Sequence, residues 1–203
     1  MGKRDNGPTT SVGKLCLAAL LLAVGIVLPQ TLHLLGGRVS GSMLLPMHLP
    51  VFVAGMLLGG SYGLAIGIVT PALSFLITGM PSFARLPFMV AELAAYGLTS
   101  GLLSAGSAGK TGASKRWGVF ATLVVSQVAG RIVYGCALFA ALHLFGMDVR
   151  PLSAVTAAFV AGLPGIAIQL ALIPPIVIFA RKRMQAHERD TGLDSGRKVP
   201  DEA

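Results

Sequence analysis

The stretch from Met43 to Leu103 constrains the fold of this chain most, because it joins an almost continuous apolar composition to frequent glycine and proline. In water, glycine and proline weaken the interior of a helix, so a soluble core rarely accepts this combination. In a bilayer, neighbouring helices satisfy the freed backbone groups and small residues let helices approach closely. Glycines recur here every four residues, the spacing of close helix contacts, at positions 55, 59, 63 and 67. The stretch therefore predicts part of a helical membrane bundle.

The composition of the whole chain supports a membrane protein. Of its 203 residues, 54% are hydrophobic and only 12% are charged, which is too apolar for an ordinary soluble domain and far too apolar for a disordered chain. Because a span takes about 20 apolar residues, the length accommodates roughly five to seven spans. We expect an all-α membrane domain at 14–183, preceded by a cytoplasmic tail at 1–13 and followed by a disordered cytoplasmic tail at 184–203.

Six apolar runs predict a compact bundle of six transmembrane helices. The second and third runs are shorter than the usual span of about 20 residues, so we expect them to be buried in the bundle, tilted or folded as a re-entrant hairpin. Gly59-Gly60-Ser61 is the predicted turn between them, and Arg38 to Ser42 is a predicted loop after the first run. The expected spans are 15–35, 45–58, 62–78, 85–103, 117–145 and 152–180.

The positions of the basic residues predict the orientation. Six spans place both termini on one side of the membrane, and that side then carries twelve Lys and Arg residues, whereas the other side carries only Arg38, Arg85 and Arg150. The positive-inside rule makes the richer side cytoplasmic. We therefore interpret the formal charge of +8 as a topological signal and not as a nucleic-acid-binding surface. The expected location is the cell membrane, with several spans in the lipid bilayer and both termini in the cytoplasm.

A few polar side chains lie within the apolar runs, where ionisable groups are costly and usually functional. Because an unpaired guanidinium near mid-span is very unfavourable, we predict that Arg131 pairs with Glu92 and joins the fourth span to the fifth. The pair fits a purely structural role and a ligand-binding role equally well, and a free Arg131 would suit a carboxylate or phosphate. Helical spacing groups further polar residues with this pair. The predicted ligand contacts are Glu92, Arg131, Tyr96, Gln127, His48, Arg85 and Tyr134.

Other polar residues carry weaker signals. His33, His48 and His143 fall near the outer ends of spans but lack a paired ligand spacing, so no metal or cofactor site is predicted. Gln169, in the sixth span, is interpreted as a structural amide in a helix kinked by proline. No Ser-His-Asp order, HExxH or paired-carboxylate motif stands out. The chain is therefore not expected to be an enzyme.

Six short motifs follow one another along the chain: Ala19-x-x-x-Ala23, Pro46-Met-His-Leu-Pro50, Leu58-Gly-Gly-Ser-Tyr-Gly63, Leu76-Ile-Thr-Gly-Met-Pro81, Glu92-Leu-Ala-Ala-Tyr-Gly97 and Gly162-Leu-Pro-Gly-Ile-Ala-Ile-Gln169. In this order, over residues 14 to 183, they resemble the substrate-binding S components of energy-coupling factor (ECF) vitamin transporters. The resemblance implies a subunit that captures a water-soluble vitamin or related micronutrient from outside, between spans four to six. It also implies docking through Ala19 and Ala23 onto a membrane coupling protein, the T component, which two cytoplasmic ATPases drive.

Two other function classes remain open on the sequence. A stand-alone secondary carrier would use Glu92 as a proton-coupling site, and its uptake would collapse with the proton gradient. A membrane scaffold without a ligand would need Glu92 and Arg131 for folding only.

Overall fold

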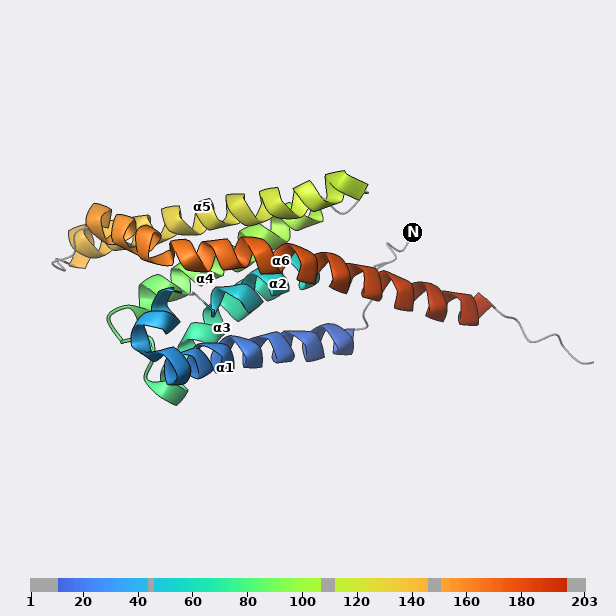
Figure 1. Cartoon of the computed structure of the whole chain (residues 1–203), viewed down its shortest axis with the longest axis horizontal. Helices are drawn as coiled ribbons and strands as arrows, with labels where there is room; N and C mark the ends of the chain where they lie inside the picture. Colours follow the sequence, from blue (N-terminus) through green and yellow to red (C-terminus); the bar gives the residue numbers. More distant parts are fainter. Residues whose placement is uncertain (1–10, 44–45, 107–111, 146–150, 197–203) are drawn as a thin grey trace, which may run out of the picture.

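The computed structural model describes residues 11–43, 46–106, 112–145 and 151–196 of the chain. Five of the helices in these ranges are long and apolar enough to cross a membrane, and α2 is a shorter apolar helix. The architecture confirms the predicted all-α membrane bundle (Figure 1). Its helices are α1 (Ser11–Met43), α2 (His48–Leu58), α3 (Gly60–Thr78), α4 (Leu86–Ala105), α5 (Gly112–Phe145) and α6 (Pro151–Gly196).

Three helix termini lie at the same end of the bundle. The start of α1, the start of α5 and the C-terminal part of α6 lie there together, on the right in Figure 1. The described ends of the chain therefore lie at the same end of the bundle. The outermost residues of the expected tails, 1–10 and 197–203, lie outside the described part of the chain.

The short helix α2 forms the core of the bundle. It contacts α1, α3, α4 and α6, and the side chains of Val51, Phe52 and Ala54 are completely buried. At 1.5 Å per residue the helix is about 16 Å long, roughly half of the ~30 Å hydrocarbon layer. A helix that is apolar on every side must be enclosed, and here the other helices enclose it, so α2 is covered by protein and not by lipid.

Glycines end both α2 and α3. Gly59 and Gly79 have φ angles of 99° and 69°, a region that residues with a side chain rarely adopt. The Gly59 N–H donates to the Gly55 carbonyl at 3.0 Å, and the Gly79 N–H donates to the Phe75 carbonyl at 2.8 Å. α3 already begins at Gly60. The turn between α2 and α3 therefore consists of Gly59 alone and not of the three residues that the sequence predicts.

α3 and α4 contact each other backbone to backbone at glycines. A Cβ atom on Gly63 would overlap the carbonyl group of Gly97, and a Cβ on Gly67 would overlap the backbone of Leu93. A Cβ on Gly55 of α2 would overlap Gly97 as well as Ser100. Three of the four regularly spaced glycines therefore lie at close helix contacts, whereas Gly59 has open space around it and serves the turn instead.

Two helices extend further than the sequence predicts. α1 continues through Pro29 to Met43, so the loop predicted at 38–42 is wrong and these residues are helical. Figure 1 shows the last turns of α1 bending away from its main axis, which is the expected effect of a proline inside a helix. α6 continues through three prolines to Gly196, so the predicted domain boundary at 183 falls inside a helix.

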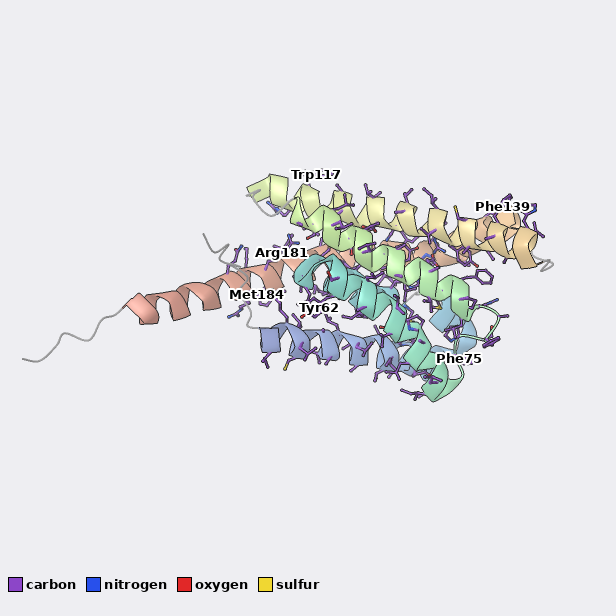
Figure 2. All side chains as sticks on the ribbon, turned by 180° about the vertical axis from the view of Figure 1, so that it is seen from behind. Tyr62, Phe75, Trp117, Phe139, Arg181 and Met184 are labelled. Carbon is purple, nitrogen blue, oxygen red and sulfur yellow. The ribbon has the colours of Figure 1, made fainter. Side chains whose placement is uncertain are left out.

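Large apolar side chains cover the outside of the bundle. Figure 2 shows them pointing outward from the helices, among them Trp117 and Phe139 near opposite ends of α5. Both side chains are exposed, as are Leu20 of α1 and Phe179 of α6. A soluble monomer rarely exposes so much contiguous apolar surface, and hydrocarbon is the solvent that suits it.

Arg181 of α6 joins three helices near one end of α2 (Figure 2). Its Nη2 atom donates to the Met56 carbonyl at 2.8 Å and to the Ser104 hydroxyl of α4. The Ser104 hydroxyl donates to the same Met56 carbonyl at 3.1 Å. Met56 belongs to the last turn of α2, whose carbonyls have no partner within the helix. α4 and α6 therefore cap α2 with side chains.

Candidate functional site

A cavity of about 590 Å³ lies between α2, α4, α5 and α6. Its volume is within the roughly 300–1,000 Å³ of small-molecule sites, which are mostly apolar with a few placed polar groups. The apolar part of the wall comes from α5 and α6. The polar part consists of five side chains from four helices: His48, Tyr96, Gln127, Arg131 and Gln169.

The ion pair predicted between α4 and α5 lies at this cavity. Arg131 Nη1 is 3.0 Å from Glu92 Oε1, and the two side chains are only 13% and 7% exposed. The Tyr96 hydroxyl donates to the same carboxylate oxygen at 2.7 Å, because a spacing of four residues places Tyr96 next to Glu92 on α4. Glu92 is thus held by two donors, and the opposite charges of the pair cancel.

The ring of Tyr96 is fixed from several sides. It packs against the ring of Phe52 with centroids 4.9 Å apart and against the ring of His48 at 5.3 Å, both from α2. On α5, a Cβ atom on Gly130 would overlap the Tyr96 ring, so the absence of a side chain there lets α5 approach. This packing determines where the Tyr96 hydroxyl and the Glu92 carboxylate lie.

Two amides connect α5 and α6 across the cavity wall. Gln127 Nε2 donates to Gln169 Oε1 at 2.9 Å. Gln169 is almost completely buried, with 1% of its surface exposed, and its Nε2 atom has no hydrogen-bond partner among the described residues. A buried donor without a partner is unfavourable, and this nitrogen has almost no accessible surface, so it does not open onto the cavity.

The structure brings together most of the predicted site. His48, Tyr96, Gln127 and Arg131 line the cavity, and Glu92 lies directly behind it, bonded to Arg131 and Tyr96. The other two predicted residues lie apart from the wall. Arg85 is exposed at the start of α4, and Tyr134 packs edge-on against Phe88.

Gln169 lines the cavity, although its sequence context favoured a structural role. Its nearest neighbours in the wall, Ile166 and Leu170, lie three residues before it and one after it, on a common helix face. The signal that points to it is an amide within an otherwise apolar face of a long span, because a polar group buried in a membrane requires a partner.

Metal binding receives no support from the described residues. Within them, no group of three or more His, Cys, Asp or Glu side chains is close enough to hold an ion. His48 belongs to the ring cluster with Tyr96, and His143 packs against Phe139 at 4.2 Å. The side chain of His33 lies outside the described part of the structure.

Gly130→Ala is expected to disturb the site through Tyr96. The added methyl group would overlap a ring that cannot move away, and overpacking of this kind lowers stability by about 1–3 kcal/mol. The measurement is the melting temperature of the detergent-solubilised protein, together with the amount of small molecule that it retains. Ala121→Val on the exposed side of α5 is the control and should change neither. Unchanged melting and retention in Gly130→Ala would contradict the packing described here.

In a comparison with known proteins, one family model matches this chain. A family model described as "ECF transporter, substrate-specific component" matches residues 13–177. The matched segment begins at the start of α1 and ends within α6, so it includes every residue of the cavity wall. No curated protein and no solved structure matches the chain.

Proposed function

We propose, from the premise that this chain belongs to the substrate-specific components of ECF transporters, that its cavity captures a water-soluble vitamin or a related micronutrient for uptake. The observation that carries the proposal is the cavity between α2, α4, α5 and α6, which polar side chains from all four helices line together with apolar residues of α5 and α6.

The proposed ligand contacts are the polar residues of the wall. Tyr96, Gln127, Arg131 and His48 are placed to orient a polar ligand, and Glu92 acts behind them by positioning Arg131 and Tyr96. Arg85 and Tyr134 are outside the proposed contact set, because neither lines the cavity.

Members of this family associate with a T component and ATPases in the membrane. For this chain we place the docking surface at Ala19 and Ala23 of α1. Both are exposed, and their spacing of four residues puts two small side chains on one helix face, where another helix can approach closely. The excess of basic residues at the end that holds both described chain ends favours a cytoplasmic position for the termini.

Ala19→Trp combined with Ala23→Trp is expected to abolish co-purification with the T component and ATP-dependent uptake, because two indole rings prevent close helix approach. The affinity for the cargo should stay within about twofold of that of the unmodified protein, a change of less than 1 kcal/mol. Val125→Trp, at an exposed position on α5, is the matched control and should leave docking intact. Docking that survives the double substitution would place the T-component surface elsewhere.

The proposed function is tested by mass spectrometry of small molecules released from the purified protein. One compound at about one molecule per chain, lost on Tyr96→Ala, is the expected result. Absence of any stoichiometric compound, together with no binding from a mixture of vitamins, would refute the proposal. Uptake that requires the ATPases and survives collapse of the proton gradient would exclude the alternative of a secondary carrier that uses Glu92.

A further inference from the structure

We propose that Arg181 binds the phosphate group of an anionic phospholipid, at the end of the bundle that holds both described chain ends. Arg181 does not line the cavity, so this site is separate from the cargo and does not depend on its identity. Three observations carry the proposal: the unbalanced charge of the guanidinium, its place at the end of a membrane span, and the distribution of the cations around it.

The contacts of Arg181 leave its charge unbalanced. The side chain is partly buried, and both groups that accept from its Nη2 atom, the Met56 carbonyl and the Ser104 hydroxyl, are uncharged. Among the side chains that the structure describes, the one carboxylate belongs to Glu92, which pairs with Arg131 at the cavity. A partly desolvated cation is unfavourable without a counter-anion, so an anion from outside this part of the chain would stabilise Arg181.

The same contacts hold the guanidinium in place and leave donors for an anion. Arginine has five N–H donors in a rigid plane, and the two recorded bonds of Arg181 both start from Nη2. Within the described residues, the N–H groups on Nη1 and Nε have no recorded partner. Hydrogen bonds between a guanidinium and phosphate oxygens are charge-assisted and strong, so a phosphate group suits these remaining donors.

Arg181 lies where the membrane-facing part of α6 ends. The candidate span is Val160–Ala186, and the next two residues, Lys182 and Arg183, are exposed. The Arg183 guanidinium lies 5.2 Å from the centre of the Phe179 ring, which is 61% exposed on the apolar outer surface. Cations directly beyond a membrane span lie at the level of the lipid headgroups and attract anionic lipids. The phosphate of a phospholipid is therefore the anion present at this depth.

The distribution of the cations favours a lipid over an acidic protein partner. Lys14 of α1 and Arg116 of α5 belong to helix starts at the same end of the bundle as this part of α6 (Figure 1). Figure 2 shows Arg181 and the exposed Trp117 at that end as well, and tryptophan is typical of the membrane interface. A protein partner covers one face of a bundle, whereas lipid headgroups surround it. Cations on three helices therefore suit the lipid surface.

Two phospholipids with the same acyl chains test the ligand class. Phosphatidylglycerol carries a net negative charge and phosphatidylcholine does not, and their binding to the intact detergent-solubilised chain is measured by native mass spectrometry. We expect about one phosphatidylglycerol per chain, bound at least about tenfold more tightly than phosphatidylcholine. Equal affinities would overturn the proposal. Inorganic phosphate that raised the melting temperature as much as phosphatidylglycerol does would show that the ligand is a soluble anion and not a lipid.

A matched pair of variants separates a site at Arg181 from a diffuse attraction. Arg181→Gln should weaken the binding of phosphatidylglycerol at least about tenfold, because it removes charge-assisted hydrogen bonds as well as a charge. Lys182→Gln makes the same change of charge one residue further on and should cost at most about fivefold, the general contribution of one cation near an anionic surface. Equal losses in the two variants would contradict a site at Arg181.

Arg181→Lys keeps the test valid if Arg181→Gln does not fold. Lysine retains the charge and a donor for the Met56 carbonyl, so the melting temperature without lipid should stay near that of the unmodified protein. The affinity for phosphatidylglycerol should still fall about fivefold, because an ammonium group lacks the planar donors of a guanidinium. Unchanged affinity would contradict the proposal. If the chain bound no phosphatidylglycerol and Arg181→Lys abolished co-purification with the T component, the anion would be a carboxylate of that protein and the lipid assignment would be wrong.

Discussion

Arg131→Met is expected to abolish retention of the cargo and to lower the free energy of unfolding by about 3–5 kcal/mol, the usual effect of removing one partner from a buried ion pair. The substitution leaves Glu92, 7% exposed, without its cation at membrane depth, and among the described residues the Tyr96 hydroxyl alone would still donate to it. The loss is measured by chemical unfolding in detergent micelles, and retention is measured by mass spectrometry of the released compound.

The double variant Glu92→Gln with Arg131→Met distinguishes a binding role from a structural one. Both charges are then absent, so most of the lost stability should return, whereas the cargo should remain absent because Arg131 lines the cavity. A scaffold without a ligand predicts a change in folding only. If the double variant bound cargo normally, Arg131 would have no part in the site.

Gly97→Ala is expected to destabilise the bundle strongly. Its Cβ would overlap the backbone of Gly63, and Gly55 of α2 also approaches Gly97 closely. Backbone atoms cannot rotate away as side chains can, so the effect should reach or exceed the upper end of the 1–3 kcal/mol range for overpacking, at about 3 kcal/mol.

The measurement for Gly97→Ala is the yield of monodisperse protein and its melting temperature. Gly106→Ala is the matched control, because it adds the same methyl group just beyond the same helix, where the nearest atom is 3.6 Å away. The control should fold normally. Equal behaviour of the two variants would show that α3 and α4 do not meet through Gly63 and Gly97.

Much of the fold follows from patterns that the sequence displays directly. Apolar runs of about 20 residues predict membrane helices because the bilayer fixes their length, and the short run that ends at Leu58 predicts a helix that cannot span alone. Glycine spacing predicts close helix contact at Gly63 and Gly67, since both effects depend on neighbours along one helix. The Glu92–Arg131 pair was predictable because an isolated charge in a bilayer is so unfavourable.

The features that were not predicted depend on contacts between distant segments. The expected first span passes through Pro29 and ends at residue 35, but α1 continues to Met43. The cap that Arg181 supplies to α2 joins residues 125 positions apart, and no local pattern indicates it. Gln169 gave only the signal of a lone amide, and its place in the cavity wall depends on how α6 packs against α5 and α2.

The contact of Arg181 with Met56 also has a consequence for the order of assembly during synthesis. α2 is made early, but the guanidinium that completes its last turn arrives only when the ribosome has made about two thirds of α6. Until then the Met56 carbonyl has the Ser104 hydroxyl as a donor but lacks the charged one, inside a low-dielectric environment where incompletely bonded groups are unfavourable. A nascent chain truncated before residue 181 should therefore remain open to membrane chaperones and proteases, and full release from them should coincide with insertion of the final helix.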